Sequence, residues 1–95
     1  MILLALLSGI GIFGDPQLDA ALRAAPAPVR SFIERRSLCD HWAGEEPYDA
    51  ARGRQISRGL RTGRCDRIDR DGARLRRLHA DDAAVVRLLD AKPAE

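Results

Sequence analysis

The chain has 95 residues, of which 45% are hydrophobic and 4% aromatic, and its formal net charge is +2. This length allows one domain at most, and the scarcity of aromatic and β-branched side chains excludes an extended sheet and favours helices. The charge is too small to indicate a polyanion partner by itself. Nearly all the basic residues are arginines, with Lys92 the single lysine, which is typical of a GC-rich bacterial genome.

The N-terminal run, residues 1–13, carries no charged side chain. A bilayer span needs about 20 apolar residues, so this run is too short to cross a membrane but fits the apolar region of a signal peptide. We therefore expect a signal peptide-like leader over residues 1–20 and a periplasmic or secreted protein, with no transmembrane helix in its mature form. The alternative is a buried N-terminal helix of a cytosolic protein.

An Ala/Pro linker is expected over residues 21–28, with one short helical turn around Leu18 to Ala24, and a small helical domain over residues 29–92. Apolar side chains at three- and four-residue spacing predict the first helix of this domain from about residue 28 to 42. Its first turn suits a proline, and Gly44 is its expected end.

A second helix is predicted from Pro47 to Gly63, with acidic side chains at the positive end of its dipole. A third is expected after the second cysteine, to about residue 79, with Asp66 or Asp69 as its cap. Leu75 and Leu78 are expected to face inward. The last predicted helix has Asp81 or Asp82 as its cap and an apolar stripe formed by Val85, Val86, Leu88 and Leu89.

The chain has two cysteines, Cys39 late in the first domain helix and Cys65 just past the second. In a simple antiparallel hairpin they lie about three turns, roughly 16 Å, apart, whereas a disulfide needs a Cα separation of about 4.4 to 6.8 Å. A disulfide therefore requires the chain after Gly63 to fold back toward the turn, or the helices to cross steeply. We predict this disulfide, because the alternative, a metal site, lacks the Cys-x-x-Cys spacing and needs His41 or His79 as further ligands.

The densest polar motif is Cys-Asp-His-Trp-x-Gly-Glu-Glu-Pro-Tyr-Asp-x-x-Arg, from Cys39 to Arg52. Together with the second cysteine and a Leu-rich basic C-terminus, it resembles a family of small exported proteobacterial proteins without an assigned function. Members of that family carry the motif with Trp or Phe at its fourth position. The resemblance covers residues 32–89 and implies export and a small helical domain. It transfers no catalytic residue and no cofactor.

Four polar side chains of this motif are candidate metal ligands or acid/base groups: His41, Glu45, Glu46 and Asp49. The first two are four residues apart, a spacing that serves either role if the helix extends that far. We favour a structural corner instead, in which the carboxylates cap the second helix or pair with Arg36 and Arg52. Neither a phosphate-binding Gly-rich loop nor a nucleophile–base motif is present in the sequence.

Between Arg52 and Arg77 the chain has ten arginines against three aspartates. Arg54, Arg58 and Arg61 share one face of the second helix and form a candidate interaction face. Its expected partner is an acidic protein or an envelope surface. Nucleic acid is disfavoured, because no aromatic side chains alternate with these arginines for base stacking and an exported protein rarely meets DNA.

The sequence thus predicts an all-α single domain of three to four short helices with one disulfide, acting as a non-catalytic binding module. The first alternative is a metal-dependent or hydrolytic site at the corner formed by residues 41–49. The second is nucleic-acid binding through the Arg-rich face.

Overall fold

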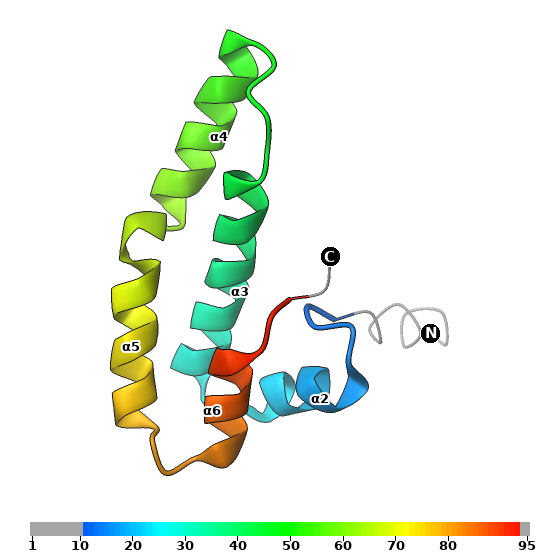
Figure 1. Ribbon diagram of the computed structural model, residues 1–95, viewed down its shortest axis with the longest axis vertical. Helices are drawn as coiled ribbons and strands as arrows, with labels where there is room; N and C mark the ends of the chain where they lie inside the picture. The colour runs from blue at the N-terminus through cyan, green and yellow to red at the C-terminus, as the bar shows by residue number, and fades with distance from the viewer. Residues whose placement is uncertain (1–10, 94–95) are drawn as a thin grey trace.

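The computed structural model describes residues 11–93, and all its regular structure is helical. The elements in chain order are α2 (Pro16–Ala24), α3 (Ala27–Ala43), α4 (Ala50–Thr62), the 3-10 turn η1 (Cys65–Arg67), α5 (Ile68–Leu78) and α6 (Ala83–Asp90). Figure 1 shows α3 running antiparallel to α4 and α5, which follow one another in a line, while α2 and α6 lie near the first half of α3.

The all-α class and the single domain are confirmed, but the described residues form five α-helices, not three to four. The additional helix is α2, which covers part of the region we assigned to the leader and to the Ala/Pro linker. It is longer than the expected single turn because the Asp15 side chain caps it, accepting hydrogen bonds from two backbone N–H groups. Residues 1–10, most of the apolar run of the predicted leader, lie outside the described part of the chain.

The hydrophobic core lies where α2, the first half of α3 and α6 meet. Its buried members are Phe13, Leu22, Val29, Phe32, Ile33, Val85, Leu88 and Leu89. The apolar stripe predicted for the last helix is therefore largely confirmed, and of its two predicted caps, Asp81 and Asp82, the structure uses Asp82. Leu78, which we expected to face inward, is 65% exposed, because it lies at the end of α5 beside an open hollow next to Pro28.

Three arginines of α3 bind the C-terminal ends of three other helices. Arg30 donates to two carbonyls at the end of α2, at 3.2 Å each, and Arg35 donates to the carbonyl of Gly63, the residue that ends α4, at 2.6 Å. Arg36 reaches three carbonyls at the end of α6, at 2.8, 3.1 and 3.3 Å. Since the last carbonyls of a helix have no partner within the helix and carry its negative dipole end, these bonds fix three helices to α3.

Helix α4 begins at Ala50 and not at Pro47 as predicted. Asp49 is its cap, and its carboxylate accepts the Arg52 N–H at 2.7 Å. Residues 45–49 are not helical and carry the chain beyond the end of α3 before α4 turns back. The Asp49 side chain satisfies a backbone N–H in the first turn of α4, whereas a proline side chain has no acceptor for such a bond. The helix therefore starts three residues later than predicted, at Ala50 and not at Pro47.

The predicted disulfide is confirmed: Cys39 and Cys65 are joined, with their Cα atoms 5.5 Å apart. Neither a fold-back of the chain nor a steep crossing is needed. Because residues 45–49 displace the start of α4 along the axis, α4 ends at the level of Cys39 and not at the start of α3. The chain also does not return to the Gly44 turn after the disulfide, since α5 continues along the first half of α3, where Asp71 pairs with Arg35 at 2.6 Å.

The capping predicted for the third helix is wrong. Asp66 lies inside η1, and Arg67 precedes α5 without a side-chain cap. The chain passes from α4 into α5 through Arg64, which has a left-handed backbone with φ of 48°, and the turn is closed by the Arg67 N–H donating to the Arg64 carbonyl at 3.0 Å. The residue before α5 is Arg67, so neither Asp66 nor Asp69 occupies the capping position.

Removing the disulfide should lower the free energy of unfolding by about 3 kcal/mol, because its loop of about 26 residues restricts the unfolded chain. The test is urea unfolding of Cys39→Ala/Cys65→Ala beside the oxidised wild type. Reductant should shift the wild-type midpoint to that of the variant and leave the variant unchanged. A wild-type midpoint insensitive to reductant would contradict this prediction.

Replacing Arg36 by Met should cost about 2 kcal/mol, because the carbonyls at the end of α6 lose a charged donor. Arg87→Met is the matched control on α6, where the side chain is exposed and a change within about 0.5 kcal/mol is expected. The measurement is the urea midpoint of each variant, and equal effects of the two substitutions would show that the α6 carbonyls gain nothing from Arg36.

Candidate functional site

The polar corner after α3 brings together two of the four predicted site residues. The His41 Nε2 lies 3.4 Å from one oxygen of Glu45, and the other oxygen of Glu45 lies 3.1 Å from the Arg52 guanidinium. Asp49 is engaged in capping α4, and Glu46 is exposed. Within residues 11–93, no group of three or more His, Cys, Asp or Glu side chains is placed to hold a metal ion.

The pairing of the corner carboxylates with arginines is confirmed for Arg52 and wrong for Arg36. The latter points to the end of α6, where it donates to the backbone. Its partial burial lowers the pKa of its guanidinium, while the charge of Asp40 raises it. Arg36 is therefore a structural residue of the core end of the molecule and does not contribute to the corner.

Trp42 joins the corner to α4. Its ring is half-buried and lies so close to the helix that a Cβ atom at Gly59 would meet the ring at 2.5 Å. The Arg52 guanidinium lies over the same ring, 5.4 Å from its centroid, an arrangement in which the ring quadrupole attracts the cation. Gly59 therefore permits a close packing between α3 and α4 that any larger residue would prevent.

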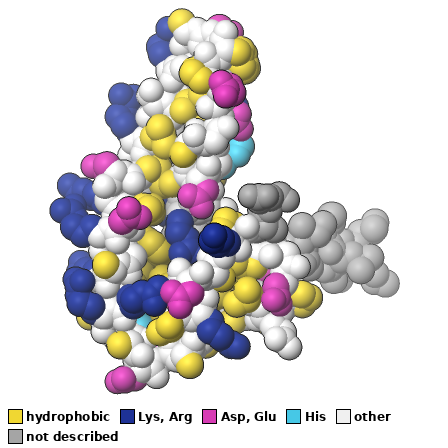
Figure 2. Space-filling model, viewed as in Figure 1, with side chains coloured by type: hydrophobic (Ala, Val, Ile, Leu, Met, Phe, Trp, Pro, Cys, Tyr) yellow, Lys and Arg dark blue, Asp and Glu magenta, His cyan; other side chains and the backbone are white. Residues whose placement is uncertain are grey.

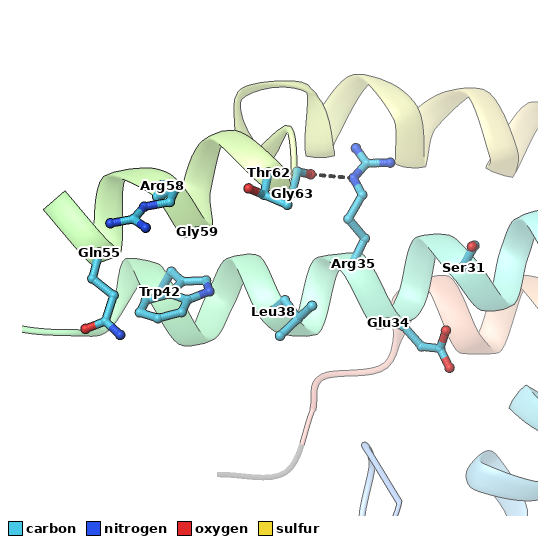
Figure 3. Close-up of a pocket in the computed structure, with 10 residues that line it drawn as sticks. All are labelled: Ser31, Glu34, Arg35, Leu38, Trp42, Gln55, Arg58, Gly59, Thr62 and Gly63. Atoms are coloured by element: carbon cyan, nitrogen blue, oxygen red, sulfur yellow. Dashed lines mark hydrogen bonds between the residues drawn. The ribbon is translucent and has the colours of Figure 1, made fainter.

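Beside this packing contact lies a hollow of about 560 Å³ between α3 and α4. Figure 3 shows Leu38 and Trp42 on the α3 side, Arg58 on the α4 side, and the Arg35 side chain reaching across to the Gly63 carbonyl. Apolar and charged side chains thus border the same concave surface.

A second hollow, of about 510 Å³, lies between α3 and α5. It shares Ser31 and Arg35 with the first hollow, so the two hollows lie next to one another along α3, with the Arg35 side chain between them. We call the two hollows together the α3 groove. Leu78 lines its second hollow, near the start of α3.

Arg35 lies at the centre of the α3 groove, where the two hollows meet. Its Nη2 lies 2.6 Å from the Asp71 carboxylate. The hydrogen bond from Arg35 is the largest effect and lowers the pKa of Asp71. Desolvation opposes this shift, and the charges of Arg35, Arg70 and Arg64 lower the pKa further. Asp71 is therefore ionised at neutral pH and neutralises Arg35 within the groove.

The predicted interaction face is part of a longer row on α4, η1 and α5. Arg54, Arg58 and Arg61 are exposed as expected, and the same three- or four-residue spacing continues through the next two elements. The complete arginine row consists of Arg54, Arg58, Arg61, Arg64, Arg67, Arg70, Arg74 and Arg77. All eight side chains are exposed, and no ion pair involves any of them in the described part of the chain.

Figure 2 shows Lys and Arg side chains gathered along the edge of the molecule that α4 and α5 form. The sequence analysis predicts an excess of arginine from Arg52 to Arg77 but assigns only Arg54, Arg58 and Arg61 to one face, so it leaves out the last five members of the row. The sequence signal for these five arginines is their three- or four-residue spacing, which continues past Gly63. This spacing indicates a single row only because α5 extends the line of α4.

Comparison of the chain with protein-family models, with curated proteins and with solved structures finds no match. None of the helices in residues 11–93 has the length and apolar character required to cross a membrane.

The contact of Trp42 with Gly59 predicts opposite effects for two glycines of α4. Gly59→Ala should destabilise the fold and shift the emission of Trp42 to longer wavelength, because the new methyl group displaces the ring into solvent. Gly53→Ala is the matched control, since its Cβ would meet only the Pro47 Cβ at 3.7 Å, and it should stabilise by up to about 1 kcal/mol through helix propensity. Thermal unfolding followed by tryptophan fluorescence measures both, and stabilisation by both substitutions would exclude the close packing.

Proposed function

We propose that this protein is a non-catalytic binding module of an oxidising compartment and that the arginine row binds an acidic protein surface. The observation that carries this proposal is the row itself, eight exposed guanidinium groups without an ion pair in the described residues. At a rise of about 1.5 Å per residue, residues 54–77 extend over about 35 Å. That length suits an extended partner surface more than a small anion.

The disulfide supports the choice of compartment. Disulfides persist in the periplasm and outside the cell and are rare in the cytosol, and the Cys39–Cys65 pair is oxidised in this fold. The signal peptide-like N-terminus and the resemblance to small exported proteobacterial proteins support the same location. We therefore propose that the protein acts in the periplasm or after secretion.

Binding is favoured over hydrolysis because the polar corner serves the fold. The Asp49 carboxylate caps α4, and Glu45 pairs with Arg52, which in turn lies over Trp42. These groups hold the connection between α3 and α4 in place, and their replacement would change the start of α4. The arginine row has no comparable structural task in the described residues, so its charge is free for a partner.

Two double variants with the same net charge test whether the arginine row is the binding surface. Arg61→Gln/Arg67→Gln, within the row, should weaken binding of poly-L-glutamate by about fivefold, since an exposed ion pair contributes up to about 1 kcal/mol. Arg23→Gln/Arg87→Gln, on α2 and α6, should change it less than twofold. Fluorescence anisotropy of labelled poly-L-glutamate at several salt concentrations measures both affinities.

Equal losses in the two variants would mean that only net charge matters and would overturn the assignment to the row. Tighter binding of duplex DNA than of poly-L-glutamate at physiological salt, with a steep salt dependence, would move the assignment to nucleic acid.

A further inference from the structure

The α3 groove exposes apolar side chains that the fold leaves uncovered. Leu38 is 58% exposed and lines the first hollow, and Leu78 is 65% exposed and lines the second. They are two of the three exposed large hydrophobic residues in the described part of the chain, the third being Tyr48. A concave surface with apolar side chains and a few polar groups has the composition of a binding groove.

The charges around the α3 groove are predominantly positive. Arg58 lines the first hollow, and Arg64 and Arg74 line the second. All three belong to the arginine row, so the row forms one edge of the groove. Glu34 is the opposing charge on α3, because Asp71 is already paired with Arg35. The excess of cations along one edge is complementary to an acidic ligand.

The length of the groove suits a helix. It follows α3 from Pro28 to Trp42, about 21 Å along the axis, which equals about four helical turns. An amphipathic helix places apolar side chains on one face at three- and four-residue spacing and inserts them into such a groove. Its flanking positions then lie beside the groove edges, where carboxylates can meet guanidinium groups.

We propose that the α3 groove binds an acidic amphipathic helix of a partner protein. The apolar face of the helix covers Leu38 and Leu78, and its carboxylates face Arg58, Arg64 and Arg74. The proposal rests on the proposed function, in which the arginine row binds an acidic protein, and it adds the conformation and the apolar face of the bound segment.

Trp42 provides a direct probe of occupancy, because it is the single tryptophan of the chain and lines the first hollow. The test ligand is a designed 16-residue helix without tryptophan, with leucines on one face and glutamates on its flanks. A scrambled peptide of identical composition is its control. Titration of the full chain with the designed helix should shift the Trp42 emission to shorter wavelength, and the scrambled peptide should bind at least tenfold more weakly.

A pair of variants separates the groove from the row. Leu38→Ser/Leu78→Ser should weaken binding of the designed helix about tenfold and leave the binding of poly-L-glutamate unchanged. Both side chains are mostly exposed, so the substitutions spare the core, and circular dichroism verifies the helical content. Tyr48→Ser, which removes an exposed aromatic outside the α3 groove, should change neither affinity.

The outcomes distinguish the two proposals. Equal binding of designed and scrambled peptides, insensitive to the leucine pair but weakened by Arg61→Gln/Arg67→Gln, would overturn the groove and retain the row. Binding of neither peptide nor poly-L-glutamate would overturn both proposals. Tighter binding of phosphatidylglycerol vesicles than of the designed helix, lost in the leucine variant, would assign the groove to a membrane surface and overturn the helix proposal.

Discussion

The structure depends on the guanidinium groups of α3 and the helix ends that they bind. Arg30, Arg35 and Arg36 each donate to the carbonyls that end another helix. A guanidinium can only donate hydrogen bonds. Each of these arginines can therefore bind the free carbonyls at the C-terminal end of a helix, and cannot bind the free N–H groups at an N-terminal end. The direction of α2, α4 and α6 at their contact with α3 follows from this restriction. The guanidinium groups of Arg35 and Arg36 also lie over the ring of Phe32, 5.7 and 5.8 Å from its centroid. Both arginines therefore also contact a core residue.

A second constraint sets the distance between α3 and the line formed by α4 and α5. A Cβ atom at Gly59, Gly63 or Gly72 would lie within 3.0 Å of a side chain or of the disulfide. The absence of a side chain at these three positions lets Trp42, the disulfide and Phe32 approach the opposite backbone closely. The side of α4 and α5 that faces α3 therefore carries these glycines. The arginines of the row occupy other positions along the same segment and are exposed. The α3 groove and the arginine row are two results of this packing.

Local signals in the sequence were sufficient for much of the fold. The extent of α3 and its end at Gly44 depend on a few neighbouring residues and were predicted correctly, and Asp82 is one of the two caps predicted for α6. The start of α4 was not predicted correctly, because Pro47 and Asp49 are both ordinary helix-start residues and the structure uses the Asp49 cap. The bonds of Arg36 join residues more than 50 positions apart, so no local pattern reveals them. Arg54, Arg58 and Arg61 were identified from spacing, whereas the rest of the row required knowing that α5 prolongs α4.

The arginine row also links the stability of the molecule to its surroundings. Neighbouring members lie three or four residues apart, about 5 to 6 Å between Cβ atoms on a helix, which is shorter than the Debye length of about 8 Å at physiological ionic strength. The arginines of the row therefore repel one another in the free protein, and this repulsion opposes the folded arrangement in which α5 continues the line of α4. Dissolved salt relieves this repulsion by screening, and the acidic partner that we propose would relieve it by neutralising the arginines. Ionic strength should consequently have opposite effects on the stability of the free protein and on the proposed complex: salt stabilises the isolated fold and would weaken the binding of an acidic partner.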